Sequence, residues 1–131
     1  KLNELKKRKR KLVDPLQFEM SIQAEDLSSY VPTFGWEVGP PTAKQLKALE
    51  NYGIFPDSIE NAGKASLLLD RLQKRKDAGL ATPKQIRMLE GRGFKYVGTW
   101  SKEEANKLIS IIAGNGWRVP LNIRPAEYRP A

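Results

Sequence analysis

Cysteine and histidine are both absent from the 131 residues of this chain. Without cysteine there are no disulfides and no thiolate ligands, and without histidine the commonest metal ligand and general base is missing. Zinc-type metal sites and the Ser-His and Cys-His pairs of covalent catalysis are therefore excluded. We expect a chain that binds no metal.

Long apolar segments are missing as well. The chain has no run of about 18 apolar residues, and no basic-then-apolar leader ends in a small-residue cleavage site. Its hydrophobic fraction of 40% and charged fraction of 29% are ordinary for a globular protein with one modest core. These features predict a cytoplasmic protein with no membrane partner. Because the chain starts at Lys1 rather than at Met, we also expect a piece of a longer protein.

Basic residues outnumber acidic ones, but they are unevenly distributed. The formal net charge is +8, and KLNELKKRKRKL at residues 1–12 carries +6 of it. Such a block can hold nucleic-acid phosphates, or it can be a solvated tail or helix. The first alternative makes Lys7, Arg8 and Arg10 candidate phosphate ligands.

The segment after the basic block predicts the helix of an N-terminal arm. In DPLQFEMSIQAEDLSSY, Asp14 is suited to cap a helix and Pro15 to begin one, so we expect a helix over Pro15–Ser28. One apolar stripe of this helix is expected to pack on the rest of the chain. It consists of Leu16, Met20 and Leu27, with Phe18 and Ile22 beside them.

A connector rich in proline and glycine follows at residues 31–41, VPTFGWEVGPP. This composition predicts an irregular segment, pinned by the aromatic residues Phe34 and Trp36. We therefore take residues 1–40 as a basic helical arm with its connector.

A repeated phrase comes next. PTAKQLKALENYGI at 41–54 and ATPKQIRMLEGRGF at 81–94 align with an offset of 40 residues, and the alignment continues without a gap to residue 113. A period near 40 residues is typical of two-helix repeat units. The sequence therefore predicts two tandem helix-loop-helix repeats, 41–80 and 81–116, and an irregular Pro-rich tail, 117–131. Identical residues stand at Thr42/Thr82, Lys44/Lys84, Gln45/Gln85, Leu49/Leu89, Glu50/Glu90, Gly53/Gly93, Ala65/Ala105 and Leu68/Leu108.

The first helix of each repeat has start and stop signals. Thr42 and Thr82 are expected N-caps, each with a glutamine three residues later to complete a capping box. Gly53 and Gly93 are expected to end these helices in the left-handed conformation. The apolar residue that follows each glycine is then placed to fold back over the helix end.

The second helices are expected to begin near residues 61 and 101 and to bury one face each. A single two-helix unit is too small to form its own core, so the predicted fold class is all-α with the two repeats packed together. We expect Trp117 and Tyr128 to anchor the tail on the repeats. The buried stripes follow helical spacing at Ala65, Leu68, Leu69 and Leu72, and at Ala105, Leu108, Ile109 and Ile112.

No catalytic constellation is present in the sequence. NAGKAS at residues 61–66 has the Gly-Lys of a phosphate loop, but the ATP-binding pattern does not fit Ser58 and Ala65. Glu103 and Glu104 are neighbours at a helix start, where acidic residues suit the dipole rather than form an acid/base pair. We therefore expect that this chain is not an enzyme and has no cofactor.

Lys44 and Lys84 stand at the second helical position, where the helix dipole disfavours a cation. One explanation is a phosphate cradle made of these lysines and the free helix N–H groups. The other is that Lys47 and Arg87 pair with the glutamate three residues later, while Lys44 and Lys84 are only solvated. Under the first explanation the candidate nucleic-acid ligands of the repeats are Lys44, Lys47, Lys84, Arg87, Arg92, Lys95, Arg71, Lys74, Arg75 and Lys76.

Aromatic residues in and beside the loops leave two readings open. Tyr52, Phe55, Tyr96 and Trp100 can stack on unpaired bases, or they can fill the core of a small domain.

Three phrases resemble the C-terminal region of DEAD/DEAH-box helicases carried by phages and mobile elements of bacteria. They are SYVPTFGWEVGPPTAKQLKALENYGI, NAGKASLLLDRLQKRKDAGLATPKQIRMLEGRGF and VGTWSKEEANKLISIIAGNGWRVP. The resemblance runs from about Asp14 to the end of the chain, and it implies an ATP-dependent superfamily 2 motor in the full-length protein. The motifs of that motor have no matching positions here, so the resemblance assigns no catalytic residue and no ATP site.

Two functions follow as hypotheses. The first is an accessory module that binds nucleic acid, with DNA as the expected form, next to the helicase motor domain of the same chain. The second is a structural or protein-docking module, which packs on the motor or recruits a replication partner through its Pro-rich, Trp-bearing connectors.

Overall fold

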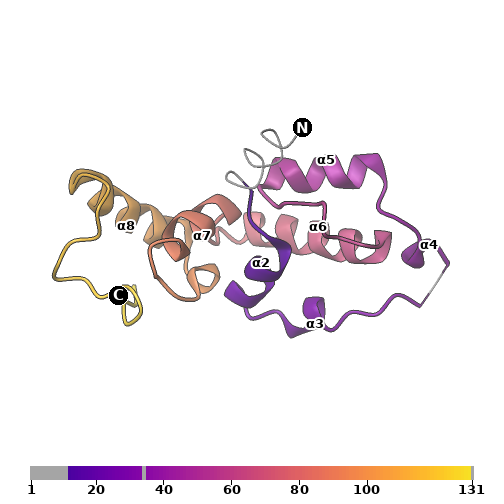
Figure 1. Ribbon diagram of the computed structural model, residues 1–131, viewed down its shortest axis with the longest axis horizontal. Coiled ribbons are helices and arrows are strands. Elements are labelled where there is room, and N and C mark those ends of the chain that lie inside the picture. Colours follow the sequence, from indigo (N-terminus) through magenta and orange to yellow (C-terminus); the bar gives the residue numbers. More distant parts are fainter. Residues whose placement is uncertain (1–11, 34, 131) are drawn as a thin grey trace.

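The structure, a computed structural model, describes residues 12–33 and 35–130. Throughout these residues the regular structure is helical, as the sequence predicts. The molecule is elongated: α5 and α3 lie on opposite sides of α6, and α7 and α8 follow along the long axis (Figure 1). The candidate ligands Lys7, Arg8 and Arg10 and the aromatic Phe34 lie outside the described residues. The elements are α2 (Pro15–Ser21), α3 (Glu25–Ser28), α4 (Gly35–Val38), α5 (Ala43–Tyr52), α6 (Ala62–Asp77), α7 (Pro83–Glu90), the 3₁₀-helix η1 (Val97–Thr99) and α8 (Lys102–Gly114).

Capping boxes begin three of the helices. The side chain of Thr42 accepts a hydrogen bond from the backbone N–H of Gln45, whose side chain accepts one in return, and Thr82 does the same with Gln85. Ser101 and its glutamate partner begin α8 in the same way. These reciprocal bonds satisfy N–H groups that have no partner within a helix, so the predicted helix starts are confirmed.

Left-handed glycines follow both α5 and α7. Gly53 is the C-cap of α5, as predicted, but α7 ends at Glu90 with Gly91 as its C-cap, so Gly93 lies in the turn beyond the helix end. Gly53 has φ 96° and Gly93 has φ 99°. Glycine adopts these values without strain, whereas a residue with a side chain would be strained. In each case the next residue donates its N–H back to the helix, from Ile54 to the Leu49 carbonyl and from Phe94 to the Leu89 carbonyl. Ile54 and Phe94 are both buried, as the sequence predicts.

Tertiary contacts also recur at an offset of 40 residues. The side-chain amide of Gln45 donates to the Ala62 carbonyl at 3.3 Å, and that of Gln85 donates to the Lys102 carbonyl at 3.3 Å. The N–H of Ala62 donates to the Gly39 carbonyl at 2.8 Å, and that of Lys102 to the Gly79 carbonyl at 2.9 Å. The same bonds therefore tie α5 to the start of α6 and α7 to the start of α8.

The predicted single helix over Pro15–Ser28 is wrong. It is broken into α2 and α3, and between them Gln23 takes the left-handed conformation with φ 57°. The break turns the chain, so that Phe18 and Leu27 are both buried although they belong to different helices. The predicted stripe is therefore wrong in part, because the side chains of Leu16 and Met20 are 56% and 64% exposed.

The connector forms a short helix where an irregular segment is predicted. Trp36 lies in α4 and is 62% exposed, so it does not pin the chain. Instead α4 packs on α6, where a side chain at Gly63 would come within 2.9 Å of Glu37 and still closer to Tyr30. The next residue, Lys64, forms an ion pair with the buried carboxylate of Glu19. The Gly-Lys of NAGKAS thus serves helix packing.

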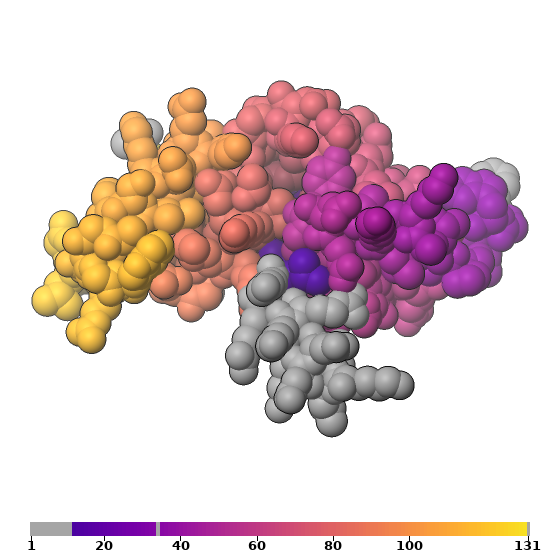
Figure 2. Space-filling model, turned by 90° about the horizontal axis from the view of Figure 1, so that it is seen from above, coloured from indigo at the N-terminus to yellow at the C-terminus, as the bar shows by residue number. Residues whose placement is uncertain are grey.

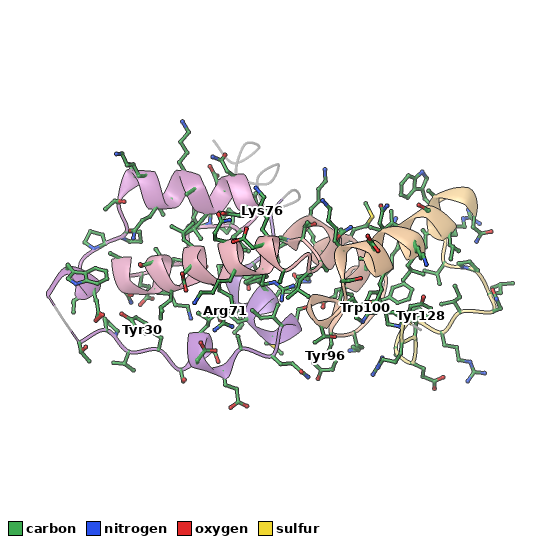
Figure 3. The ribbon with its side chains drawn as sticks, turned by 180° about the vertical axis from the view of Figure 1, so that it is seen from behind. Tyr30, Arg71, Lys76, Tyr96, Trp100 and Tyr128 are labelled. Atoms are coloured by element: carbon green, nitrogen blue, oxygen red, sulfur yellow. The ribbon has the colours of Figure 1, made fainter. Side chains whose placement is uncertain are left out.

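The tail returns to the second repeat through Tyr128. Its ring makes edge contacts with Phe94 and Trp100, with centroids 5.5 and 5.6 Å apart (Figure 3). Pro125 lies against Gly93, 3.2 Å from where a Cβ would stand. Trp117 is 54% exposed, so the prediction that it anchors the tail is wrong. Its φ of 64° belongs to the turn after α8, in which its N–H donates back to the Ile112 carbonyl at 2.9 Å.

The arm docks on the second repeat where η1 meets α2. The N–H of Gly98 donates to the Ser21 hydroxyl at 2.8 Å, and that hydroxyl donates to the Glu90 carboxylate at 2.5 Å. Glu90 also accepts from the N–H of Val97 at 3.1 Å. A Cβ on Gly98 would stand 2.5 Å from the Ile22 side chain and 2.9 Å from the backbone of Ser21. This contact therefore requires glycine.

We predict that Gly98→Ala destabilises the fold by about 1–3 kcal/mol, because the added methyl group meets the backbone of α2 and forces it away. Urea unfolding followed by far-UV circular dichroism measures the change. The matched control is Gly114→Ala, since a Cβ on Gly114 meets nothing within 4 Å. Equal stability of the two variants would show that the close approach of α2 contributes little.

Candidate nucleic-acid interface

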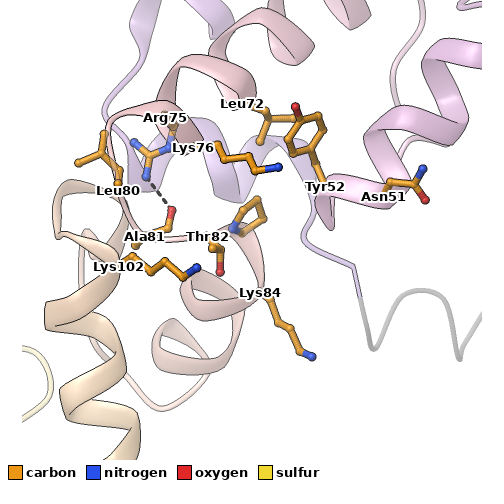
Figure 4. A pocket seen from close by; sticks show the side chains of 12 residues that line it. Asn51, Tyr52, Leu72, Arg75, Lys76, Leu80, Ala81, Thr82, Lys84 and Lys102 are labelled. Atoms are coloured by element: carbon orange, nitrogen blue, oxygen red, sulfur yellow. Dashed lines mark hydrogen bonds between the residues drawn. The ribbon is translucent and has the colours of Figure 1, made fainter.

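Three lysines from different elements line a groove where the ends of α5 and α6 face the starts of α7 and α8. Lys76 comes from the end of α6, Lys84 from the start of α7 and Lys102 from the start of α8 (Figure 4). All three are exposed. The groove has a volume of about 500 Å³, and no aspartate or glutamate lines it. It is therefore a concave, cationic surface.

The turns between the helices position these lysines. The left-handed Gly53 brings the end of α5 against the start of α7, where its Cβ would stand 3.4 Å from Pro83. Next to this junction, the N–H of Ala81 donates to the Trp100 carbonyl at 3.0 Å. That bond, together with the one from Lys102 to Gly79, holds the start of α8 beside the end of α6. The groove is thus fixed by backbone hydrogen bonds.

A second hollow adjoins the groove along α7. It has a volume of about 910 Å³ and shares Asn51, Tyr52 and Lys84 with the groove. It adds the cations Arg87 and Arg92, together with one carboxylate, Glu50. In Figure 2, which looks down on the α5 side, the surface is recessed between α5 and α7.

The arginines of the second hollow are held by backbone carbonyls. Arg87 donates to the Leu12 carbonyl at 2.8 Å, and Arg92 donates to the Met88 carbonyl at 3.3 Å. Glu90, the expected partner of Arg87, instead accepts hydrogen bonds from α2 and η1, including one from Gln17 at 3.3 Å. Each guanidinium keeps further N–H groups for a ligand, since an arginine has five donors.

Arg75, a predicted ligand, is buried and engaged within the fold. Its side chain is 8% exposed, and its guanidinium donates to the carbonyls of Ala81 and Gly98 at 3.0 and 2.8 Å. The guanidinium also lies 5.6 Å from the centroid of the Phe18 ring, a cation–π contact. Burial, with a smaller contribution from the charge of Arg71, lowers the pKa of Arg75 to about 10, so it remains a cation at neutral pH.

Two other candidates on α6 are engaged in ion pairs. Arg71 pairs with Asp26 of α3 at 2.5 Å, and Lys74 pairs with Asp70 one turn earlier at 3.0 Å. Both pairs are at the surface, so they do not block a ligand, but their acids reduce the local positive charge. The basic run at residues 71–76 is therefore split: Arg75 and Lys76 both line the groove, and of these two Lys76 is the exposed one.

The remaining candidates lie away from the groove. Lys44 and Lys47 are exposed on α5, about 12 Å and about 7.5 Å along the helix from Tyr52, the end that borders the groove. Lys95 lines a separate hollow with Glu90 and Tyr96. The two lysines of the repeated phrase thus occupy different places, and Lys84 is the one that borders the groove.

The sequence predicts that the aromatic residues in and beside the loops either stack on bases or fill the core, and some of them are buried while others are exposed. Phe55 and Trp100 are buried, so they fill the core. Tyr96 is 47% exposed beside the hollow of Lys95. Tyr52 borders the groove with a half-buried ring, and its hydroxyl donates to the Gln73 side chain at 2.6 Å. Tyr52 is therefore the aromatic that lies next to the lysine cluster.

Lys102 is a site residue that the sequence reasoning missed. The equivalent position in the first repeat is Ala62, so the comparison of the two repeats did not point to it. The sequence feature that could have pointed to Lys102 is the capping box at Ser101, because it places residue 102 at the start of a helix. Only the junction of the repeats brings it beside Lys76 and Lys84.

Comparisons with known proteins do not identify a family: no family model, curated protein or solved structure matches the chain. Within the part of the chain that the structure describes, no helix is long and apolar enough to cross a membrane. In that same part, acidic residues nowhere gather in a group of three or more that could hold a metal ion.

We predict that Arg75→Ala destabilises the fold by about 2–4 kcal/mol, because two buried carbonyls lose a charged donor. Lys76→Ala, the matched change at the next residue, is expected to alter stability by less than about 0.5 kcal/mol, since Lys76 is exposed. Thermal and urea unfolding of both variants measure the difference. A stable Arg75→Ala variant would contradict the structural role of this cation.

Proposed function

We propose that this chain is an accessory nucleic-acid-binding module and that its contact surface is the groove between the repeats. The observation that supports this is that Lys76, Lys84 and Lys102, from three different helices, all line one groove that has no acidic lining. Cations placed together repel one another, so a polyanion that neutralises them gains affinity. Nucleic-acid phosphates also release condensed counterions when lysines bind them.

The repeat explains why the groove exists. We propose that residues 41–80 and 81–116 are two equivalent units, supported by the helix starts, glycine ends and hydrogen bonds that recur at an offset of 40 residues. The second unit follows the first with the start of α7 against the end of α5. The groove lies at this junction, so it needs two units, and neither unit alone contains it.

The role in a larger protein rests on the resemblance to DEAD/DEAH-box helicases. In this proposal the motor domain of the full-length protein hydrolyses ATP and moves along nucleic acid, with DNA as the expected form. The present module then holds the nucleic acid near the motor. Tethering two weak sites raises the effective concentration of each for the same strand, which is the physical benefit of such a module.

A docking module is the second candidate, and exposed apolar residues favour it. Leu16 and Met20 of α2 border a hollow of about 450 Å³ together with Tyr96, and all three are exposed. Trp36 of the connector is 62% exposed. In this alternative the apolar surface packs on the motor or on a replication partner, and the basic groove has no ligand.

Fluorescence anisotropy of a labelled DNA oligonucleotide over a salt series tests the first candidate. We predict binding that weakens with salt, and we predict that Lys84→Glu weakens it at least about tenfold through one lost phosphate contact and one added repulsion. Lys107→Glu makes the same charge change on the exposed surface of α8, outside the groove, and is expected to have little effect. Lys44→Glu separates the two lysines of the repeated phrase and is also expected to have a small effect.

Three results would count against this proposal. No binding tighter than about 100 μM at low salt, or binding without a salt dependence, would reject the nucleic-acid function and favour the docking module. Equal losses from Lys84→Glu and Lys107→Glu would show that net charge, and not the groove, attracts the DNA.

A further inference from the structure

We propose that the groove takes a single strand and holds one unpaired base against Tyr52, with its phosphates on the lysines. This inference rests on the proposed function and goes further, because it names the form of nucleic acid and a stacking residue.

The floor of the groove is largely apolar. Leu72, Leu80 and Pro83 line it together with the ring of Tyr52. The guanidinium of Arg75 also lies there, bound to two backbone carbonyls, while the three lysines supply the exposed charge. A surface for phosphates alone needs only cations and N–H donors, and an apolar floor adds nothing to it. An unpaired base has two apolar faces and a polar edge, so it matches an apolar floor within a cationic rim.

Tyr52 is held in place before any ligand arrives. It is the last residue of α5, and the hydroxyl at the far end of its ring donates to Gln73 of α6 at 2.6 Å. Gln73 is in turn held by Asp77 at 3.0 Å. A ring fixed at both ends loses little conformational freedom when a base stacks on it, so stacking costs less than on a mobile side chain.

The cations form a path that a strand can follow. Lys76 lies close to Tyr52, and Lys102 and Lys84 lie on the α8 and α7 sides of the groove (Figure 4). The second hollow continues from Lys84 to Arg87 and Arg92 along α7. A strand with a base in the groove can therefore continue over this hollow with its phosphates near the arginines.

A double helix does not fit this arrangement. Its bases are stacked and paired inside, so none is free to enter a groove of about 500 Å³. Its phosphates lie on a convex surface and would meet the rim lysines while the apolar floor stays empty. The apolar floor and Tyr52 thus favour a single strand, whose bases are free to turn outward.

The experiment compares three labelled DNAs of equal length in fluorescence anisotropy: a thymidine single strand, the same backbone with abasic sites throughout, and a duplex. We expect the thymidine strand to bind at least about fivefold tighter than the abasic strand, which is the lower end of stacking on one aromatic ring. With three lysines engaged, its affinity is expected to fall with a slope of about −2 in log–log salt plots. The duplex is expected to bind more weakly than the thymidine strand.

Variants of Tyr52 locate the effect. Tyr52→Ala is expected to reduce the affinity for thymidine to that for the abasic strand and to leave abasic binding unchanged. Tyr52→Phe keeps the ring and is expected to keep the preference for thymidine. Circular dichroism checks that each variant is folded. If Tyr52→Ala does not fold, the wild-type comparison of the three DNAs still decides whether a base is bound.

The results separate this inference from the proposed function. Salt-dependent binding in which the abasic strand or the duplex equals the thymidine strand would overturn the single-strand site and leave the nucleic-acid function standing. A preference for thymidine that survives in Tyr52→Ala would overturn the role of Tyr52. Loss of all salt-dependent binding would instead reject the proposed function.

Discussion

The buried guanidinium of Arg75 joins three parts of the chain that are far apart in sequence. It extends from α6, donates to the link before α7 and to η1, and lies over the ring of Phe18 in α2. A buried cation is tolerated only where its donors are satisfied, so these partners must stay in place together. The groove depends on the same arrangement. Arg75 lies at its base, and Lys76, about 100° further around the helix, is directed into the open part of the groove.

The junction of the repeats also gives the lysine of the repeated phrase a favourable setting. Lys84 stands at the start of α7, which carries partial positive charge. Yet the end of α5, with partial negative charge, lies against that same turn. Head-to-tail contact of the two helices therefore offsets the unfavourable position. Lys84 therefore remains a surface cation, and its repulsion from the positive end of the helix dipole is smaller than it would be in an isolated helix.

Local signals in the sequence predicted the helix starts, the glycine stop at Gly53 and the buried stripes, because each depends on residues within one or two turns. The predicted stop at Gly93 is wrong in position, since α7 ends at Glu90 with Gly91 as its C-cap. The stripes are buried at Ala65, Leu68 and Leu72 and at their equivalents in α8. Features set by distant partners were not predictable in this way. The break at Gln23 depends on how α2 meets η1, and the burial of Arg75 depends on two carbonyls contributed by later segments. The site was predicted only in part, since Lys102 reaches the groove through the junction alone.

The contact of Pro125 with Gly93 has the same form as that of Pro83 with Gly53, although the first proline comes from the tail and the second from a helix. In both, the flat ring of a proline covers the turn that ends a helix. The tail therefore takes, after α7, the place that α7 itself takes after α5. Pro125 and the ring of Tyr128 cover the turn at Gly93 in the way that Pro83 covers the turn at Gly53.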